Sequence, residues 1–554
     1  MSASDKKKLR KEQAAALLSE KQKKEQAEAK KLKAITISFV AIMLVVALTA
    51  ASILGIRAVN NSGIIDKNTL AATTGAHNLN SVQMNYYLND YMINTYSQWK
   101  ESYGDSISMY MMMSGLDINK PLNQQVYDKE TGKTWADQFL QEALAKAKSD
   151  YALYDKAIAE GFTLTEDEQS ALDLSMKQLE LSAMMYGYRN PNKYLCAIYG
   201  HGSTLKSYAE YTKISAIATA YYSKHSDSLS YDDAAIRAHE KEHPNDYTSY
   251  TYASYYLSAS SFLQGGTTGE NNTVTYSDEE KETARKTAEE LANTLAASTD
   301  LDSLDKAIAA LEINKDKKDA ASTKNTSVLY PQILAAMQPW LSDAARVAND
   351  ITVIPNESVS TDAEGKETKT INGYYVVLFE SRDENLEPLA NVRHLLVAFE
   401  GGTTSSDGSI VYSDEQKAAA KTEAERLLQV WKDGAATEES FIALVKEHTD
   451  DSGSKENGGL YEDITPASPF VPSFLTWSTD PDRKPGDTSV LISEYGYHVM
   501  YYVSDDEMNY RDYMISEELR TDDMEKWFTD ITDAATITCV NTKRLNLDAV
   551  LANL

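Results

Sequence analysis

Two histidines in the C-terminal third of the chain lie in segments that read as β-strands. His394 stands in VRHLLV (392–397), and His498 stands in GYHV (496–499). Two imidazoles on neighbouring strands can hold a hydrogen-bond network in which each ring fixes the tautomer of the other. Taken alone, a pair of strand histidines is more often a satisfied part of the core, so the interpretation depends on the residues around them.

Acidic, aromatic and hydroxyl residues lie between the two histidines. Asp450 and Asp451 precede Ser-Gly-Ser, where a carboxylate either faces a bound group or closes a turn. Three aromatic residues follow at near-helical spacing: Phe470, Phe474 and Trp477. Such a set forms either an apolar cup or ordinary core. Ser493 stands where it could complete a polar rim beside His498.

The chain shows no pattern typical of a metal site or a hydrolase. The 8 histidines are scattered without ligand spacing, and no nucleophile elbow is present. We therefore expect no metal and no cofactor. The chain has 2 cysteines, Cys196 and Cys539, and their spacing leaves open whether they pair.

The segment with both histidines is the second copy of a duplicated domain. Residues 265–291 and 401–427 align without a gap and are identical at 13 of 27 positions. Each copy ends in a Gly-Tyr strand, at 373–376 and at 496–499. The pattern predicts a strand, a glycine-rich loop, a long capped helix, an irregular middle and a final strand. In the second copy, Ser413 with Gln416 predicts the helix cap.

The ordered motifs of the second copy resemble parvulin-type peptidyl-prolyl isomerase domains. After VRHLLV come a helix at 441–444, TDDSGS (449–454), Gly-Gly-Leu (458–460), the aromatic run, RKPGD (483–487) and YGYHV (495–499). The resemblance implies a catalytic set of His394, His498, Asp451, Asp450 and Ser493. It places the two histidines side by side in the pocket floor, on neighbouring strands. It implies a substrate-binding set of Phe470, Phe474 and Trp477. The family's usual Asp before the Leu is missing, so Asp450 and Asp451 remain alternatives for the carboxylate that faces the substrate carbonyl.

The first copy is expected to be parvulin-shaped but inactive, because it has no histidine. Tyr375 stands where the second copy has His498. Opposite His394 the first copy offers Tyr255 or Ser258, depending on where the gap falls. The alternative function for the whole chain is therefore a non-catalytic holdase with parvulin-shaped modules.

An uncharged segment near the N-terminus predicts a membrane anchor. Residues 34–56 contain 23 consecutive uncharged residues, and about 20 span a bilayer. The first 33 residues carry a net charge of +6, which predicts a cytoplasmic N-terminus and an extracytoplasmic remainder. A cleaved signal peptide is the weaker interpretation. The whole chain has a net charge of −29, so the residues after 33 carry about −35. This negative charge argues against a nucleic-acid partner.

In the helical part, Tyr199-Gly200, Tyr208 and a capped helix that begins at Ser230 resemble the PrsA/SurA-like foldases, as does the order of domains along the whole chain. The resemblance implies an α+β architecture and a chaperone. Since an exported chain lies where ATP is absent, we expect the chaperone to be ATP-independent. Between 80 and 241 the apolar spacing is helical, and Thr165 with Glu168 predicts a helix cap. The implied partners are unfolded or partly folded exported proteins and proline-containing peptides, and a homodimer is left open. The expected divisions are a basic tail (1–33), a transmembrane helix (34–56), a linker (57–79), a helical domain (80–247), a degenerate parvulin-like domain (248–382), a parvulin domain (388–504) and a C-terminal helical segment (505–554).

Overall fold

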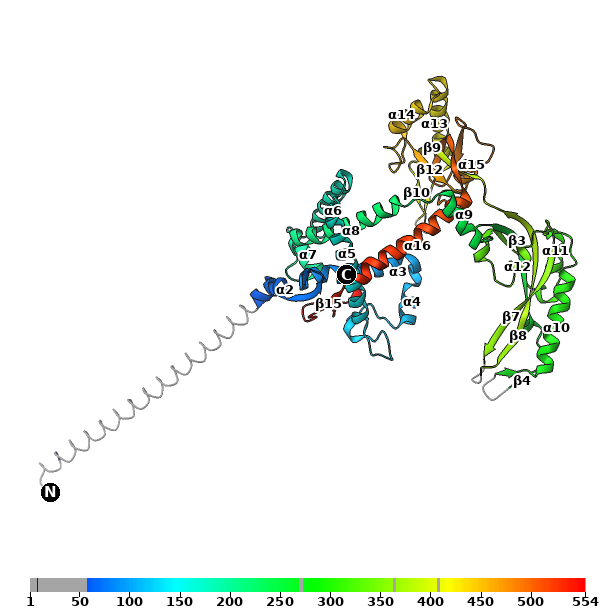
Figure 1. Ribbon diagram of the computed structural model, residues 1–554, viewed down its shortest axis with the longest axis horizontal. Helices are drawn as coiled ribbons and strands as arrows, with labels where there is room; N and C mark the ends of the chain where they lie inside the picture. The colour runs from blue at the N-terminus through cyan, green and yellow to red at the C-terminus, as the bar shows by residue number, and fades with distance from the viewer. Residues whose placement is uncertain (1–6, 8–56, 269–272, 362–364, 406–408, 554) are drawn as a thin grey trace. The chain divides into compact units, whose positions relative to one another are not determined.

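The chain folds into two compact units (Figure 1). The computed structural model describes residue 7 and residues 57–553, except 269–272, 362–364 and 406–408. Among the described residues, the first unit contains those before 230 and those after 521, and the second contains those from 230 to 521. The expected membrane segment, 34–56, lies outside the described residues. Among the residues that are described, no helix has the length and apolar character needed to cross a membrane.

The first unit is mostly helical, and its long helices begin at side-chain caps. As expected, Thr165 caps α6 (Glu166–Met185): Glu168 N donates to Thr165 Oγ1 at 3.2 Å, and Thr165 N donates to the Glu168 carboxylate at 2.7 Å. Such a capping box satisfies backbone donors that have no partner within the helix. Equivalent boxes open α3 (Ser81–Tyr103), α5 (Trp135–Ala159) and α8 (Leu205–Ser228). The shorter helices are α2 (Ile64–Asn68), α4 (Ile107–Ser114) and α7 (Pro191–Tyr199).

Residues 57–79, which we expected to be a linker, contain α2 and two strands. The central strand β1 (Leu70–Thr74) pairs antiparallel with β2 (His77–Asn80) and with β15 (Ile537–Cys539). A strand of 5 residues is too short to show a clear period in the sequence. Its second partner also comes from the other end of the chain, so local sequence could not indicate the pairing. The helical unit also ends at Leu229 rather than at 247, since α9 (Asp233–Glu242) belongs to the second unit.

The second unit contains two four-stranded antiparallel sheets with the same topology. In the first copy the strand order is β6-β3-β8-β7, and in the second it is β12-β9-β14-β13. The first sheet comprises β3 (Ser249–Ser258), β6 (Thr323–Leu329), β7 (Ile351–Thr361) and β8 (Glu367–Asp383). The second comprises β9 (Pro388–Ala398), β12 (Leu460–Ile464), β13 (Thr488–Ile492) and β14 (Gly496–Asn509). The duplication read from sequence is therefore a duplication of fold.

The helices and short hairpins also correspond between the two copies. The first copy has α10 (Asp278–Leu295), α11 (Leu301–Ala309) and α12 (Gln338–Leu341), with the hairpin β4 (Thr267–Thr268) and β5 (Val274–Thr275). The second has α13 (Asp414–Asp433), α14 (Glu438–His448) and α15 (Pro472–Ser478), with β10 (Thr403–Thr404) and β11 (Ile410–Val411). The cap predicted at Ser413 is confirmed, since Gln416 N donates to Ser413 Oγ at 3.3 Å and Ser413 N donates to Gln416 Oε1 at 2.8 Å. After β14 the chain enters α16 (Tyr510–Ala534).

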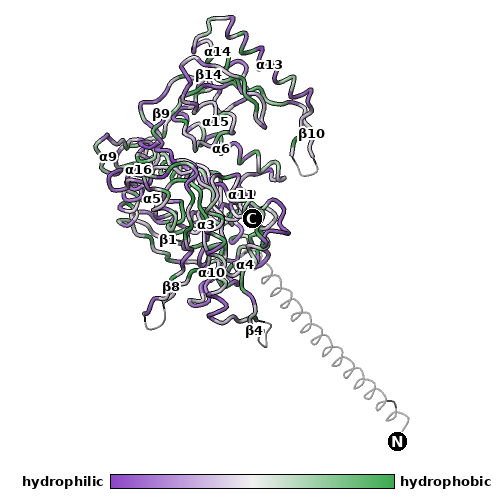
Figure 2. The backbone as a smooth tube through the Cα atoms, turned by 90° about the vertical axis from the view of Figure 1, so that its right-hand side faces the viewer, coloured by the Kyte–Doolittle hydropathy of each residue, from purple (hydrophilic) through white to green (hydrophobic). Residues whose placement is uncertain are grey.

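The two faces of the second sheet have different partners, because successive side chains on a strand alternate between faces. Leu395 and Val499 face α13 and α14 in one hydrophobic core. Val392 and Met500 face α15 in another core. Apolar and polar residues alternate along α13 in Figure 2, as expected of a helix with one face on a sheet. Residues two positions from Val392 and Met500 therefore lie on the α15 face of the sheet.

Candidate active site

Strand register places His394 and His498 diagonally across β9 and β14 on the α15 face. His498 lies opposite Leu396, and His394 lies opposite Met500. Both imidazoles are buried, with 5% and 6% of the residue surface exposed. Their Nδ1 atoms are 3.1 Å apart, so the two rings are directly hydrogen-bonded. The sequence expectation that the two histidines lie side by side is what the structure shows.

The Gly-Gly turn before β12 is required by its closeness to His394. Gly459 has a φ of +75°, and a Cβ atom there would lie 2.2 Å from the carbonyl oxygen of His394. The two backbones meet because His394 N donates to Gly459 O at 2.9 Å. Only glycine tolerates both the left-handed conformation and this approach. The turn therefore holds β12 against the histidine strand.

A hydrogen-bond chain of four side chains runs through the site. Ser493 Oγ lies 2.8 Å from His498 Nε2, and His394 Nε2 lies 2.9 Å from Asp451 Oδ2. The Nδ1–Nδ1 contact joins the two halves. An ionised carboxylate only accepts, and a neutral imidazole has one donor and one acceptor nitrogen. With both rings neutral, these rules assign every proton: Ser493 donates to His498, His498 Nδ1–H donates to His394 Nδ1, and His394 Nε2–H donates to Asp451.

The Asp451 carboxylate is held in its charged form by several donors. Besides His394, the Ser454 hydroxyl donates to Oδ2, the Tyr461 hydroxyl donates to Oδ2 at 3.1 Å, and Gly453 N donates to Oδ1 at 3.0 Å. Hydrogen bonds to the ionised form lower a carboxyl pKa. The His394 bond is the largest cause, and together the donors keep the pKa of Asp451 well below its usual range. Sequence reasoning missed Ser454 and Tyr461.

Burial keeps His498 neutral. Desolvation disfavours the imidazolium, and the neighbouring His394 adds to this effect, so the pKa of His498 is lowered to about 4. At neutral pH the site therefore combines a charged Asp451 carboxylate with a neutral His498 ring. The arrangement fixes the position of the charge and of the rings that lie beside it. It suits catalysis by orientation and electrostatics better than proton abstraction.

An aromatic wall stands beside the histidines. Phe474 packs edge-on against His394 and His498, at centroid distances of 5.5 and 5.9 Å. Phe470 stacks on Phe474 at 4.7 Å. Phe474 is only 2% exposed, whereas Phe470 is half-buried. Phe470 is therefore the part of the predicted cup that a ligand can reach, and Phe474 is its support.

Trp477 is placed beneath the cup rather than in it. Its ring packs against Tyr502, and the Arg483 guanidinium lies over it at 4.9 Å. In the first copy, Arg346 lies over Trp340 in the same way at 5.0 Å. A contact that is present in both copies indicates a role in the fold. The expectation that Trp477 binds substrate is thus replaced by a packing role.

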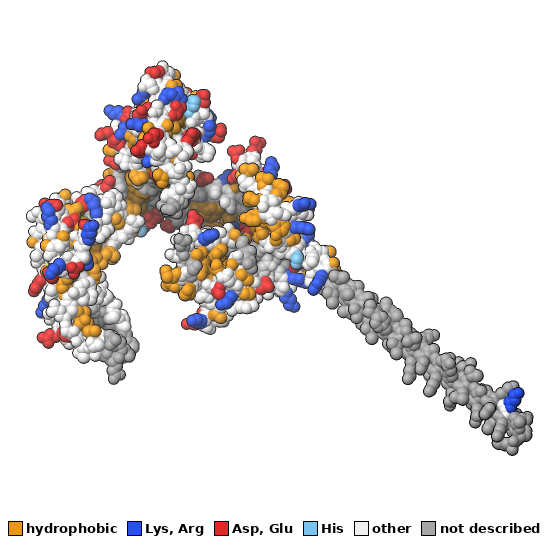
Figure 3. Space-filling view, turned by 180° about the vertical axis from the view of Figure 1, so that it is seen from behind, with side chains coloured by type: hydrophobic (Ala, Val, Ile, Leu, Met, Phe, Trp, Pro, Cys, Tyr) orange, Lys and Arg blue, Asp and Glu red, His pale blue; other side chains and the backbone are white. Residues whose placement is uncertain are grey.

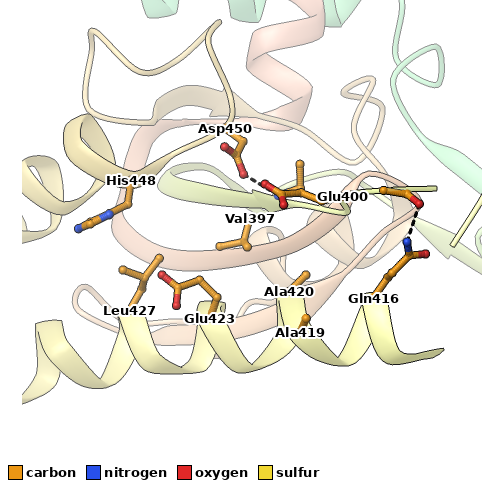
Figure 4. Close-up of a pocket in the computed structure, with 11 residues that line it drawn as sticks. Val397, Glu400, Gln416, Ala419, Ala420, Glu423, Leu427, His448 and Asp450 are labelled. Carbon is orange, nitrogen blue, oxygen red and sulfur yellow. Dashed lines mark hydrogen bonds between the residues drawn. The ribbon is translucent and has the colours of Figure 1, made fainter. Parts of the chain in front are cut away.

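Of the two alternative aspartates, the structure brings Asp451 to the histidines and takes Asp450 elsewhere. Asp450 Oδ2 accepts a hydrogen bond from Ala398 N at 2.9 Å, which satisfies the end of β9. Figure 4 shows Asp450 at the rim of a separate cavity of about 560 Å³. Val397, Ala420 and Leu427 line this cavity on the α13 side of the sheet, on the opposite face from the histidines.

The first copy replaces the hydrogen-bond chain with uncharged residues. Gly373 pairs with Ser258 just as Gly496 pairs with Ala398, so counting back along β3 brings Ser254 to the position of His394. Our expectation of Tyr255 or Ser258 at this position is wrong. The turn at 259–262 adds residues between the strand and the glycine loop, and the gapless loop alignment concealed this insertion.

The other site positions of the first copy follow from the same register. Tyr375 takes the place of His498, as expected, and Asn356 takes the place of Ser493. The Tyr375 ring lies against Tyr256 at 4.7 Å, and Asn356 Nδ2 donates to the Tyr256 hydroxyl at 3.1 Å. None of these side chains supplies the charge and linked tautomers of the second copy.

Two histidines do have the spacing of metal ligands, contrary to our reading of the sequence. His239 and His243 stand one helical turn apart at the end of α9, with rings stacked at 4.6 Å. Their nitrogens contact the Tyr247 hydroxyl at 2.7 Å and the Asp246 carboxylate at 3.0 Å. In the part of the chain that the structure describes, no group of three His, Cys, Asp or Glu side chains could hold a metal ion. Cys196 and Cys539 are both free thiols.

Comparison with known proteins gives a family match over the second copy. Residues 375–506 match the family model described as PPIC-type PPIASE domain. No curated protein sequence matches the chain. The solved structure of PrsA from Bacillus anthracis is 20% identical, with a TM-score of 0.17, and the match covers 27% of this chain and 59% of that chain. PrsA from Bacillus subtilis is also 20% identical, with a TM-score of 0.18, and the match covers 27% of this chain and 51% of that chain. A match titled as the SurA-like chaperones PEB4 and Cj1289 of Campylobacter jejuni is 21% identical, with a TM-score of 0.15, and covers 26% of this chain and 52% of that chain.

The second copy is therefore similar to PPIC-type peptidyl-prolyl isomerase domains, the parvulin class. The match to the family model begins within β8 and ends within β14, so it covers both histidine strands and the loop that contains Asp451.

Proposed function

We propose that the second copy isomerises X–Pro bonds in partly folded exported proteins, while the helical unit holds them. The observation that supports this most directly is the closed chain from Ser493 to Asp451 beside the half-buried ring of Phe470. Interconversion of X–Pro bonds is slow enough to limit folding. An enzyme of this kind would therefore accelerate a slow step in the folding of its clients.

The catalysis we propose needs no covalent step. Peptide rotation has a barrier of about 18–20 kcal/mol because conjugation gives the C–N bond double-bond character. Phe470 would hold the proline ring, while the fixed charge of Asp451 lies near the carbonyl that precedes it. Conjugation places negative charge on that oxygen in the planar state and less in the twisted state. A nearby carboxylate therefore raises the energy of the planar state more than that of the twisted state.

The test is cis–trans exchange of a proline-containing peptide, measured by exchange NMR with the full chain. Ser493→Ala removes the donor to His498 and should slow the exchange. Asn356→Ala, at the equivalent position of the first copy, is the matched control and should leave the rate unchanged. The proposal is wrong if the full chain gives no acceleration, or if both variants lose the same activity.

Client holding is proposed from apolar side chains exposed on the helical unit. Met112 and Met113 on α4 are 78% and 83% exposed, and Met185 at the end of α6 is 78% exposed. Hydrophobic side chains gather on this unit in Figure 3. Methionine is flexible and polarisable, which suits varied apolar partners. Because the first 33 residues are basic and 34–56 are uncharged, we further propose that the chain is anchored with this unit outside the membrane, where holding proceeds without ATP.

Holding is tested by the suppression of aggregation of an unfolded client. Replacing Met112 and Met113 with Ser should weaken suppression and leave peptide exchange intact. Val359→Ser is the control, since Val359 is also 55% exposed but lies in the first parvulin-like copy. Unchanged suppression in the double methionine variant would remove α4 from the holding surface.

A further inference from the structure

Tyr461 contacts both the polar chain and the aromatic wall of the isomerase site. It is the second residue of β12 and lies opposite Val392 on β9. Its hydroxyl donates to Asp451 Oδ2 at 3.1 Å. Its ring lies 5.3 Å from the His394 ring and 5.0 Å from the Phe470 ring. The side chain is half-buried.

At neutral pH the hydroxyl of Tyr461 is protonated and donates to the charged Asp451. Burial and the Asp451 carboxylate both raise the pKa of Tyr461. On the same oxygen, Asp451 also accepts from His394 and from Ser454. Three donors therefore fix the position of Asp451 Oδ2. That oxygen in turn orients the His394 ring, because the His394 Nε2–H bond ends on it.

The position of Tyr461 follows from the Gly-Gly turn and from the architecture of both copies. Gly459 holds β12 against the backbone of His394, so the residue two positions later is carried into the site. In the first copy, strand register places Asn325 at this position, and its Nδ2 donates to Ser254 Oγ at 3.3 Å. Ser254 itself takes the place of His394. In both copies the side chain at this position contacts the residue at the centre of the opening strand, which is His394 in the second copy and Ser254 in the first.

We propose that Tyr461 is a positioning residue of the isomerase. Its hydroxyl fixes Asp451 and, through it, His394, while its ring braces Phe470. The inference rests on the proposed isomerase function. The two parts of the side chain have separable effects, because the hydroxyl acts on the charge near the reacting bond and the ring acts on the wall that holds proline.

The experiment compares Tyr461→Phe and Tyr461→Leu in the full chain, using peptide exchange to separate kcat from KM. Tyr461→Phe should lower kcat roughly tenfold with KM within about twofold, since it removes one hydrogen bond to a charged group. Tyr461→Leu should lower kcat and also raise KM, because the wall beside Phe470 is lost. Tyr501→Phe is the control, since Tyr501 lies on the opposite face of the sheet.

A second readout does not depend on turnover. The side-chain carboxyl ¹³C resonance of Asp451 should titrate at a higher pH in Tyr461→Phe than in the wild type, because one donor to the charged form is gone. Substituting 3-fluorotyrosine, a stronger donor of nearly the same size, should move the titration the other way, which keeps the test available if Tyr461→Phe folds poorly. An unchanged titration together with an unchanged kcat would overturn the proposal. If the wild type itself lacks turnover, the isomerase function fails, and the titration still decides whether Tyr461 positions Asp451.

Discussion

His498 is expected to bind a proton only near pH 4, far below the ordinary value of 6.5. Burial of the ring is the main cause, and the adjacent His394 is the second. The difference corresponds to about 3 kcal/mol, at roughly 1.4 kcal/mol per pKa unit. The unfolded chain takes up this proton from about pH 6.5, and the folded domain does so only from about pH 4. The stability that the neutral ring contributes is therefore complete above pH 6.5 and is lost as the pH falls toward 4.

The assay is a pH titration of the full chain with ¹⁵N-labelled histidine, followed by long-range ¹H–¹⁵N correlation NMR. His498→Gln identifies the signal. We expect His498 to remain in the Nδ1–H tautomer and His394 in the Nε2–H tautomer at neutral pH, as the hydrogen-bond chain requires. Isomerase activity should then show no inflection from His498 near pH 6.5.

A His498 midpoint near 6.5 would refute the argument from burial. A His498 ring protonated on Nε2 at neutral pH would refute the assigned direction of the chain, because Nε2 could then not accept from Ser493. Either result would mean that the two histidines are linked differently from the way their distances indicate.

Three further predictions concern the wall, the turn and the carboxylate. Phe470→Ala should weaken binding of a proline peptide by calorimetry, whereas Phe474→Ala should mainly lower unfolding stability, by about 3–5 kcal/mol, because its ring is buried; a fully stable Phe474→Ala variant would contradict this. Gly459→Ala should strongly lower the melting temperature of the domain, while Gly486→Ala, also at positive φ but with open space around it, should cost far less; equal losses would count against the close approach. Asp451→Asn should lower kcat. Because the pKa of Asp451 is depressed, the wild type should lose stability when the pH falls below about 4, and urea unfolding should show that the variant does not lose this part. An unchanged dependence of stability on pH below about 4 would show that Asp451 is not held by its donors.

The sequence predicted those parts of the fold whose causes are local. Caps at Thr165 and Ser413 could be read because the capping residue and its partner stand three positions apart. The two-residue period of strands brought His394 and His498 to one face once their strands were paired. The similarity of the two copies predicted two domains of one topology, which the two sheets confirm.

What the sequence missed depends on contacts between distant segments. Ser254 could not be matched to His394, because a turn of four residues shifts the first copy without changing the loop motif. Tyr461 belongs to no motif, and only the approach of β12 to β9 brings it to Asp451. Trp477 stood at the right spacing for the cup, but its partners, Arg483 and Tyr502, direct it into the core.

The central claim is that His394 and His498 act as one hydrogen-bonded unit in proline isomerisation. The most direct test is a double-mutant cycle of His394→Ala and His498→Ala in the full chain, with kcat/KM measured on a proline peptide and folding checked by near-UV circular dichroism. Each single substitution should lower kcat/KM, and the double substitution should cost clearly less than the sum of the two in free energy, because the first already breaks the shared chain. Full activity in both folded single variants, or strictly additive losses, would contradict the account.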